Sequence, residues 1–207
     1  MTKNNIFTKK QRAYLPFKRF LDIFNSFFGI IFCFAFIWWW VFIINLFATK
    51  GHPFYCPLRV GKNKKEFRML KFRSLKYGSP EVPPSELKLE EQAKMYTGFG
   101  NFLRKSSLDE TPQLFNIFVG QMSFIGPRPG AVKNEELLIK EREKYNPNAY
   151  DVRPGLSGYA QVKMNRQHDP SDKAYYDHFY VKNISFKLDF KTFGFTIIRL
   201  FGLMKGR

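Results

Sequence analysis

The sequence predicts a membrane-associated protein that combines helices with short strands. Three observations favour this class. An apolar run extends from Phe27 to Ile44, a helix-start signal stands at Thr111-Pro112, and charged and apolar residues alternate from Lys71 to Ser74. With 207 residues, the chain is long enough to bury one core.

The apolar run is long enough to enter a membrane. Its 18 residues would form a helix of roughly 27 Å, close to the ~30 Å hydrocarbon layer. No charge occurs between Asp22 and Lys50, and basic residues flank the run on both sides, so the positive-inside tendency pulls both flanks toward the cytoplasm. We therefore expect a re-entrant hairpin, although a single-pass anchor is the commoner outcome from hydropathy alone.

Two further segments have a simpler composition. Pro80–Leu89 is polar and contains prolines, which predicts an exposed connection before a helix that runs to about Lys105. Phe186–Met204 mixes Phe, Ile and Leu with few charges. This pattern suits a helix lying in the lipid headgroup layer and a buried core helix about equally.

Asp109 and Glu110 are adjacent carboxylates in a strongly basic chain. The residue before a proline avoids helical φ/ψ, whereas proline suits the first helical position. We therefore expect a helix that starts at Pro112, is capped by Thr111 and stops near Gly120. The two carboxylates would then lie just outside the positive end of this helix.

A structural reading of the same carboxylates has about even odds on local pattern. Ser107 and Glu110 have the S-x-x-E spacing of a capping box. Pro112 weighs slightly against that reading, because in the capping-box register it would fall inside the new helix.

The chain carries 34 Lys and Arg against 17 Asp and Glu, which gives a net charge of +17. This excess predicts a polyanionic partner, namely nucleic acid, acidic phospholipid or a phosphorylated substrate. The sequence contains no GxxxxGK[ST] or GxGxxG loop, and its histidines have no short metal-ligand spacing. Its aromatic residues gather in the apolar run, which disfavours nucleic acid.

Several cations are held in stiff or extended backbone. Lys71 and Arg73 would share one face of a short strand, and Arg128 stands between two prolines within Gly126–Gly130. Arg153 stands in a similarly constrained segment, in which Pro and Gly follow it. Guanidinium groups bind phosphate strongly, although each segment taken alone is more often a solvated turn or strand face.

These segments follow one another in an order that covers nearly the whole chain. The motifs are Lys18-Arg-Phe-Leu-Asp-Ile23, Arg59-Val-Gly61, Lys71-Phe-Arg73, Leu103-Arg104, Ser107-Leu-Asp-Glu110, Pro112-Gln-Leu-Phe-Asn116, Met122-Ser123, Gly126-Pro-Arg-Pro129, Arg153-Pro-Gly155, Gly158, Ala160-Gln-Val162, Tyr180-Val181 and Asp189. Together they resemble the bacterial sugar transferase family, the monotopic phosphoglycosyl transferases that begin glycan assembly on a polyprenyl phosphate. The short length resembles the minimal catalytic form of that family.

The resemblance implies a fold that is mostly α with small β elements (α/β). This compact monotopic membrane domain would have an N-terminal re-entrant helix (1–50) and a catalytic domain with C-terminal interfacial amphipathic helices (51–207). It implies transfer of a sugar phosphate from a UDP-sugar to undecaprenyl phosphate, with release of UMP, at the cytoplasmic face of the bacterial inner membrane. Anionic membrane lipids would be further partners and nucleic acid would not; the oligomeric state stays open, a homodimer included.

The resemblance also assigns residues to roles. Asp109 corresponds to the nucleophile that forms a phosphosugar intermediate in a ping-pong reaction, and Glu110 to the ligand of Mg²⁺. The cations expected around the substrate phosphates are Lys71, Arg73, Arg104 and Arg128. The residues expected to bind the nucleotide are Arg153, Gly155, Gly158 and Gln161.

The chain departs from the family pattern at three places. The usual Ser-Pro break of the membrane helix is absent, so Gly29 or polar side chains would have to interrupt it. The residues before the Arg59-Val-Gly61 motif are unusual, and so is the segment from Lys163 to Arg166, which implies a different sugar donor. The alternatives that we retain are a membrane-tethered nucleic-acid-binding protein and an inactive membrane scaffold.

Overall fold

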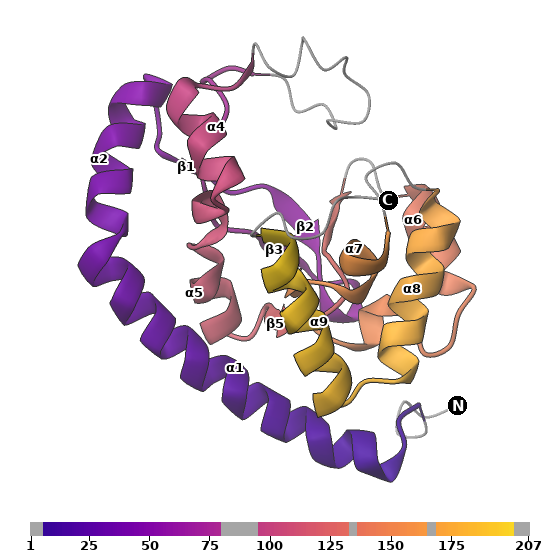
Figure 1. Cartoon of the computed structure of the whole chain (residues 1–207). Coiled ribbons are helices and arrows are strands. Elements are labelled where there is room, and N and C mark those ends of the chain that lie inside the picture. Colours follow the sequence, from indigo (N-terminus) through magenta and orange to yellow (C-terminus); the bar gives the residue numbers. More distant parts are fainter. Residues whose placement is uncertain (1–5, 80–94, 133–135, 165–168, 201–207) are drawn as a thin grey trace. The chain divides into compact units, whose positions relative to one another are not determined.

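A computed structural model describes residues 6–79, 95–132, 136–164 and 169–200. It is mostly helical with small sheets, as predicted (Figure 1). The chain divides into two compact units, each of which takes segments from both sides of residue 50. The first unit is Met1–Phe24, Leu58–Phe67 and Ile117–Arg207, and the second unit is Asn25–Pro57 and Arg68–Asn116. The connection predicted at Pro80–Leu89 lies outside the described residues, and the domain limits predicted at residue 50 stay a prediction.

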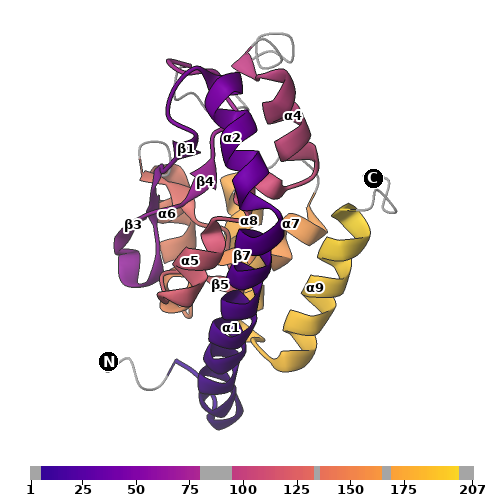
Figure 2. The ribbon, with the colours of Figure 1, turned by 90° about the vertical axis from the view of Figure 1, so that its left-hand side faces the viewer.

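The second unit packs helices against a two-stranded sheet. Helix α2 (Trp38–Thr49) lies beside α4 (Gly98–Lys105), as Figure 2 shows. Strand β1 (Phe54–Tyr55) pairs antiparallel with β4 (Lys71–Phe72). Val41, Phe72 and Leu103 form the buried centre of this unit, so one residue comes from each of α2, β4 and α4.

The first unit contains two small sheets. Strands β3 (Glu66–Arg68), β2 (Leu58–Val60) and β6 (Gly130–Ala131) form one sheet in that order, with the turn η2 (Lys62–Lys64) between β2 and β3. The other sheet pairs β5 (Ser123–Ile125) and β7 (Gly155–Ser157) in parallel. This parallel pair places the start of the predicted Arg128 segment, Gly126–Gly130, beside the predicted nucleotide segment that begins at Arg153.

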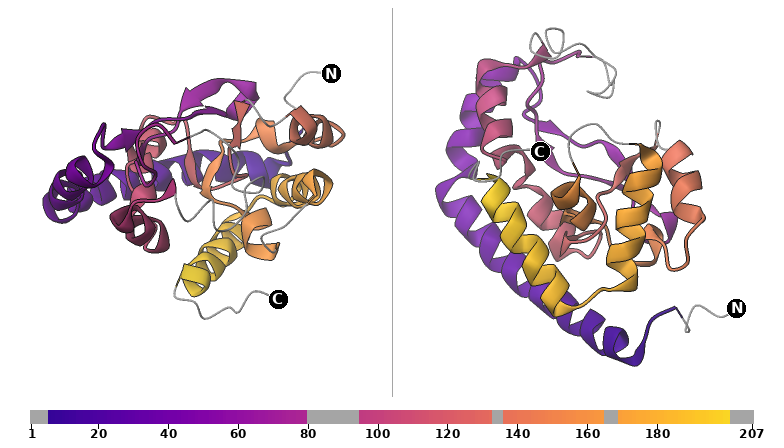
Figure 3. Two further views of the ribbon diagram at one scale, coloured as in Figure 1. Left: turned by 90° about the horizontal axis from the view of Figure 1, so that it is seen from above. Right: turned by 45° about the vertical axis from the view of Figure 1, so that its right-hand side comes forward.

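Helices surround these sheets. Figure 3 shows α6 (Glu136–Glu143) alongside α8 (Pro170–Lys182), and the remaining elements are η6 (Ala149–Asp151), α7 (Tyr159–Lys163) and α9 (Phe186–Leu200). Asp169 caps α8 by accepting a hydrogen bond from Ser171 N, and Pro170 occupies its first turn. The core of the unit comprises Ile125, Val152, Tyr180, Val181 and Ile184.

Helix α1 (Lys9–Phe36) and helix α2 bury polar residues and expose apolar ones. Asp22, Ser26, Asn45 and Thr49 are at most 4% exposed, and the large exposed side chains include Phe20, Phe24, Phe28, Phe32, Trp39 and Phe47. Such an inverted pattern suits lipid, where polar groups must find partners inside the protein. Within the described residues, α1 is also the one helix that is long and apolar enough to cross a membrane by length and composition.

The apolar run is interrupted at Ile37, where α1 ends and α2 begins. The backbone of Ile37 has φ −120° and ψ −51°, outside the helical region, and the helix axis changes direction there (Figure 1). Gly29, which we considered as a break, lies inside α1. The interruption is therefore present without a proline, eight residues beyond that glycine.

Helix α9 has one buried face and one exposed apolar face. Asp189 and Thr192 are buried, whereas Phe186, Phe190 and Phe193 are at least half exposed. The segment beyond Leu200, up to the predicted end at Met204, lies outside the described residues.

Candidate active site

Asp109 and Glu110 lie on a single 3-10 turn, η4 (Leu108–Glu110), which we call the carboxylate turn. Ser107 precedes it with φ +57° and accepts a hydrogen bond from Glu110 N through its carbonyl oxygen, at 3.2 Å. The Ser107 side chain makes no capping hydrogen bond to the turn, so the predicted capping box is not formed. Of the two readings of this segment, the one that required a Ser107 cap is therefore not seen.

Thr111 differs from the prediction, because its backbone is helical (φ −59°, ψ −31°) although it precedes Pro112. Its N–H donates to Leu108 O at 3.2 Å, and its hydroxyl donates to the same carbonyl at 2.8 Å. Thr111 therefore closes the carboxylate turn instead of capping the next helix. That helix, α5 (Gln113–Phe118), begins one residue later than predicted, and Gly120 follows its end at φ +89°, as predicted.

Lys71 meets Glu110 within the second unit. Lys71 Nζ lies 2.7 Å from Glu110 Oε1, and 15% and 20% of the two side chains is exposed. Asp109 is 7% exposed. The structure therefore brings together one predicted phosphate-binding cation and the predicted metal ligand, directly beside the predicted nucleophile.

Arg73 and Arg104, the other predicted cations of this unit, contact tyrosines. Strand β4 ends before Arg73, whose Nε donates to His52 O at 2.9 Å and whose guanidinium lies over the Tyr55 and Tyr77 rings. The Arg104 guanidinium lies over the Tyr96 ring and donates to its hydroxyl. Lys71 and Arg73 thus have different partners, although they are only two positions apart.

The carboxylate turn suits Mg²⁺ by its chemistry. The described residues contain no group of three or more His, Cys, Asp or Glu side chains that could hold a metal. Mg²⁺ commonly takes only one or two protein carboxylates and fills its other positions with water and phosphate oxygens. Asp109 and Glu110 fit that donor set, and Lys71 already places a cation against Glu110.

In the first unit, two predicted ligand-binding segments lie against each other. Gly126 N donates to Ser157 O, and Gly155 N donates to Pro127 O, both at 2.9 Å. A β-carbon at Gly155 would come within 2.1 Å of Gly126 N, so a larger residue cannot fit there. The glycines of these segments therefore serve close backbone packing, which presents Arg128 beside the β7 strand.

Arg142 and Asp177 support the Arg128 segment, and the sequence analysis did not single them out. Arg142 donates to Asp177 Oδ2 through Nε at 3.0 Å and through Nη2 at 2.6 Å. The same Nη2 donates to Arg128 O at 3.0 Å. Both side chains are almost fully buried, so this ion pair joins α6 to α8 and fixes the backbone at Arg128. Both residues lie in helices that carry many other charged side chains, so nothing in the sequence marked these two as a buried ion pair.

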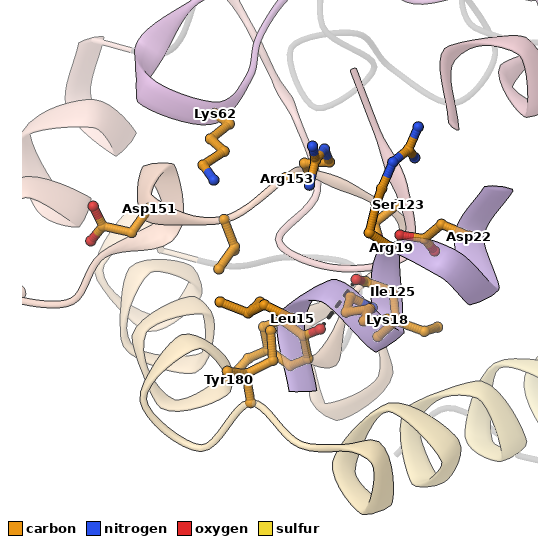
Figure 4. A pocket seen from close by; sticks show the side chains of 12 residues that line it. Leu15, Lys18, Arg19, Asp22, Lys62, Ser123, Ile125, Asp151, Arg153 and Tyr180 are labelled. Atoms are coloured by element: carbon orange, nitrogen blue, oxygen red, sulfur yellow. Dashed lines mark hydrogen bonds between the residues drawn. The ribbon is translucent and has the colours of Figure 1, made fainter. Parts of the chain in front are cut away.

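A small cavity of the first unit gathers cations from distant segments (Figure 4). Arg153 of the predicted nucleotide segment lines it together with Lys62 of η2 and with Lys18 and Arg19 of α1. Its volume of about 60 Å³ is far below the ~300 Å³ at which small-molecule pockets begin. The cavity as it stands is therefore too small to hold a nucleotide.

The arginines at this cavity bind the end of α5. Arg19 donates to Ile117 O at 2.6 Å and to Phe118 O at 2.7 Å. Arg153 Nε donates to Gly120 O at 2.8 Å. Ile117 O also accepts a hydrogen bond from Gly120 N at 3.0 Å. The two guanidinium groups thus add donors to carbonyls of the last turn of α5 and of Gly120, where helical donors run out.

Gln161, on α7, has a side-chain oxygen that lacks a donor. Its Oε1 atom is buried without a hydrogen-bond partner in the part of the chain that the structure describes. The oxygen lies near Gly158, where a β-carbon would approach it within 3.2 Å. Buried acceptors are usually satisfied, so this oxygen can accept a hydrogen bond from a ligand.

Asp189 explains why motifs at both ends of the chain belong together. Its Oδ2 accepts hydrogen bonds from Lys18 Nζ at 2.5 Å and Tyr14 at 2.7 Å, and its Oδ1 accepts one from Tyr180 at 2.7 Å. Burial, followed by the charge of Asp189, raises the pKa of Tyr180 well above its ordinary value. This network ties α1, α8 and α9 into one unit.

The predicted site residues therefore form two groups. The second unit carries Asp109, Glu110, Lys71, Arg73 and Arg104, and the first unit carries Arg128, Arg153, Gly155, Gly158 and Gln161. Fold and site together define a helical protein that has one candidate membrane helix among its described residues and an acidic turn in which a lysine pairs with Glu110.

Comparison with known proteins identifies the family. Residues 13–202 match the bacterial sugar transferase family. An uncharacterized sugar transferase of Haemophilus influenzae is 38% identical over 154 residues, which are 67% of this chain and 30% of that protein. The UDP-glucose:undecaprenyl-phosphate glucose-1-phosphate transferase of Xanthomonas campestris pv. campestris is 34% identical over 160 residues, 75% of this chain and 33% of that protein.

A third relative is named for a different sugar. The UDP-N-acetylgalactosamine-undecaprenyl-phosphate N-acetylgalactosaminephosphotransferase of Aeromonas hydrophila is 35% identical over 164 residues, 74% of this chain and 37% of that protein. The chain thus spans about a third of the length of these relatives. It belongs to the bacterial sugar transferase family.

Proposed function

We propose that the chain transfers a sugar 1-phosphate from a UDP-sugar to undecaprenyl phosphate and releases UMP. The observation that carries this proposal is the carboxylate turn, in which buried Asp109 stands beside a Glu110 paired with Lys71. The family and the names of the relatives support the same reaction. The relatives are named for different sugars, so the donor sugar has to be found by experiment.

The reaction proceeds in two displacements at phosphorus. In the first, an Asp109 carboxylate oxygen forms a bond to the sugar-bearing phosphorus, and the bond from that phosphorus to the bridging oxygen breaks, releasing UMP. In the second, a phosphate oxygen of undecaprenyl phosphate attacks the same phosphorus, and the Asp109 carboxylate leaves. Neither displacement requires a proton, because UMP and the carboxylate both leave as anions.

Attack by a carboxylate on a phosphate needs cations that mask the negative charge. Mg²⁺ held by Glu110 would supply that charge stabilisation when bound. Lys71 stands at the turn and binds Glu110 or a phosphate oxygen of the donor. Arg73 and Arg104, from the same unit, are proposed to contact donor phosphates as well.

The remaining residues proposed to bind the donor belong to the first unit, namely Arg128 for a phosphate and Arg153, Gly155, Gly158 and Gln161 for the nucleotide. Arg128 has its backbone fixed by Arg142, and Arg153 starts the predicted nucleotide segment. The buried oxygen of Gln161 can accept a hydrogen bond from a base or ribose. Gly155 and Gly158 allow the chain segments around them to approach closely.

The acceptor and the net charge favour the cytoplasmic leaflet of the inner membrane. Exposed aromatic residues on α1, α2 and α9 would lie among lipid tails, and the +17 charge would attract anionic headgroups. We propose that α1 and α2 form a re-entrant hairpin, with its bend at Ile37.

The test measures UMP release by the detergent-solubilised protein with Mg²⁺, undecaprenyl phosphate and a panel of UDP-sugars. At least one donor should give sustained release, and without the lipid acceptor the same donor should give a single burst and a phosphosugar adduct on Asp109. Asp109→Asn should abolish both, while Asp172→Asn, at an exposed acid on α8, should behave as wild type. Normal release by Asp109→Asn, or no release with any donor, would refute the proposal.

A further inference from the structure

The break at Ile37 lacks the usual cause of a helix kink. No proline occurs between Pro16 and Pro53, and sharp kinks otherwise need glycine or serine pairs, π-bulges or an inserted side chain. Instead, all three tryptophans of the chain follow the break directly, at Trp38, Trp39 and Trp40. Their indole N–H groups are the first side-chain N–H donors after the break in the sequence.

Trp40 satisfies the backbone that the break exposes. Its Nε1 donates to Phe36 O at 2.9 Å, and Phe36 is the last residue of α1. Carbonyls in the last turn of a helix have no helical donor, and lipid offers none. The Trp40 indole thus allows an interruption without proline in an apolar surrounding.

Trp38 makes its contact with the carboxylate turn. Its Nε1 donates to Thr111 Oγ1 at 3.0 Å. The same hydroxyl donates to Leu108 O at 2.8 Å, the bond that closes the turn carrying Asp109. One hydroxyl therefore joins the start of α2 to the turn on which the proposed nucleophile lies.

Packing reinforces this hydrogen bond. The Trp38 ring lies against that of Phe115 on α5, with centroids 5.2 Å apart. Trp38 is half-buried and packs on the core of the second unit, where Leu108 of the carboxylate turn packs as well. Trp39 is 58% exposed, so it provides a control of the same residue type one position away.

We infer that Trp38 is a positioning residue, which holds the carboxylate turn through Thr111 and so couples the break in the apolar helix to the geometry of Asp109. The contact itself is independent of the reaction, but its catalytic consequence rests on the proposed function. A turn that loses the indole donor relaxes around Leu108, and Asp109 then spends less time in the geometry for attack.

The experiment compares Trp38→Phe with Trp39→Phe in one detergent. Removing one hydrogen bond should lower kcat for UMP release about fivefold and leave KM for the UDP-sugar within about twofold. Amide hydrogen exchange at residues 108–114 should become faster in Trp38→Phe and stay unchanged in Trp39→Phe. Thr111→Ser keeps the hydroxyl, so its kcat and its amide exchange should equal those of the wild type.

A double variant tests whether Trp38 acts through Thr111. In a Thr111→Val background, Trp38→Phe should have no further effect on kcat or exchange, because the shared hydroxyl is already lost. Equal behaviour of Trp38→Phe and Trp39→Phe, or full additivity with Thr111→Val, overturns the inference. If Trp38→Phe does not fold, Thr111→Val against Thr111→Ser tests the same contact from the other side.

The two proposals can fail separately. If the wild-type protein releases no UMP from any donor, the proposed function fails, and the exchange measurement still decides whether Trp38 holds the turn. If the wild type is active and exchange in Trp38→Phe equals that of the control, only the positioning role of Trp38 is overturned.

Discussion

Lys71 Nζ lies 2.7 Å from Glu110 Oε1 in the second unit. Both side chains are mostly buried, so solvent screens this pair less than it would a surface pair. The Lys71 ammonium already gives Glu110 a positive partner, which is what a divalent cation bound to the same carboxylate would be. Metal and lysine should therefore compete for one carboxylate.

The first prediction is that Lys71→Met binds Mg²⁺ more tightly than wild type. Removing the competing cation should lower the Kd for Mg²⁺ about threefold to tenfold, measured by calorimetry without substrate. The KM for the UDP-sugar should rise, because a cation for its phosphates is lost. Lys76→Met removes an exposed lysine of the same unit and should change neither value. Weaker Mg²⁺ binding by Lys71→Met would contradict the competition.

The second prediction concerns the buried Arg142–Asp177 pair. Asp177→Asn leaves the Arg142 guanidinium buried without a counter-charge, which should lower the free energy of unfolding by about 3–5 kcal/mol. Activity should fall in the folded fraction too, because Arg142 also holds Arg128 O. Chemical denaturation in detergent measures the stability, and UMP release measures the activity.

The matched control is the exposed pair of Lys144 and Glu141 on the same helix region. Glu141→Gln should cost less than about 1 kcal/mol, since exposed pairs contribute little. Equal stability of Asp177→Asn and Glu141→Gln would show that the buried pair does not fix the Arg128 segment.

The sequence predicted the elements near the carboxylates better than their local geometry. Pro112 correctly placed the start of α5 to within one residue, and Gly120 its end. The conformation predicted for Thr111 was wrong. The hydrogen bonds that close the turn on Leu108 outweigh the preference of a residue before proline for a non-helical backbone. Such a choice depends on a hydrogen bond that sequence spacing does not reveal.

Contacts between residues that are distant in the sequence could not be predicted either. Lys71 and Glu110 lie 39 positions apart in the sequence. Neither the strand pattern around Lys71 nor the adjacent carboxylates indicated that these two side chains pair. The break at Ile37 could not be placed, because its determinants are side-chain hydrogen bonds of tryptophans, which the sequence marks only as interfacial residues. The short strands were predicted only at Lys71, because two or three residues are too few for a periodic pattern.

The third prediction uses the pKa of Tyr180. Burial first, and then the Asp189 carboxylate, raises this pKa well above its ordinary value, so the folded state favours the neutral phenol. The stability that this contributes is complete below the unfolded pKa of about 10 and is lost as the pH rises toward the folded-state pKa. Unfolding free energy should therefore decline above pH ~10 in wild type and decline less in Tyr180→Phe. Tyr175→Phe, at an exposed tyrosine of α8, should keep the wild-type slope; an equal slope in Tyr180→Phe would contradict the assignment.

The fourth prediction tests the re-entrant hairpin. In a background of Cys33→Ala and Cys56→Ser, single cysteines at Lys9 and Lys50 flank α1 and α2 at exposed positions. A hairpin that turns back at Ile37 places both on one side of the membrane, because positive charge flanks both ends of the apolar run. A membrane-impermeant maleimide should leave both unlabelled in intact cells and label both in inside-out vesicles. Labelling of one position in cells and of the other only in inverted vesicles would establish a single-pass helix, and the bend at Ile37 would then be a kink within a span.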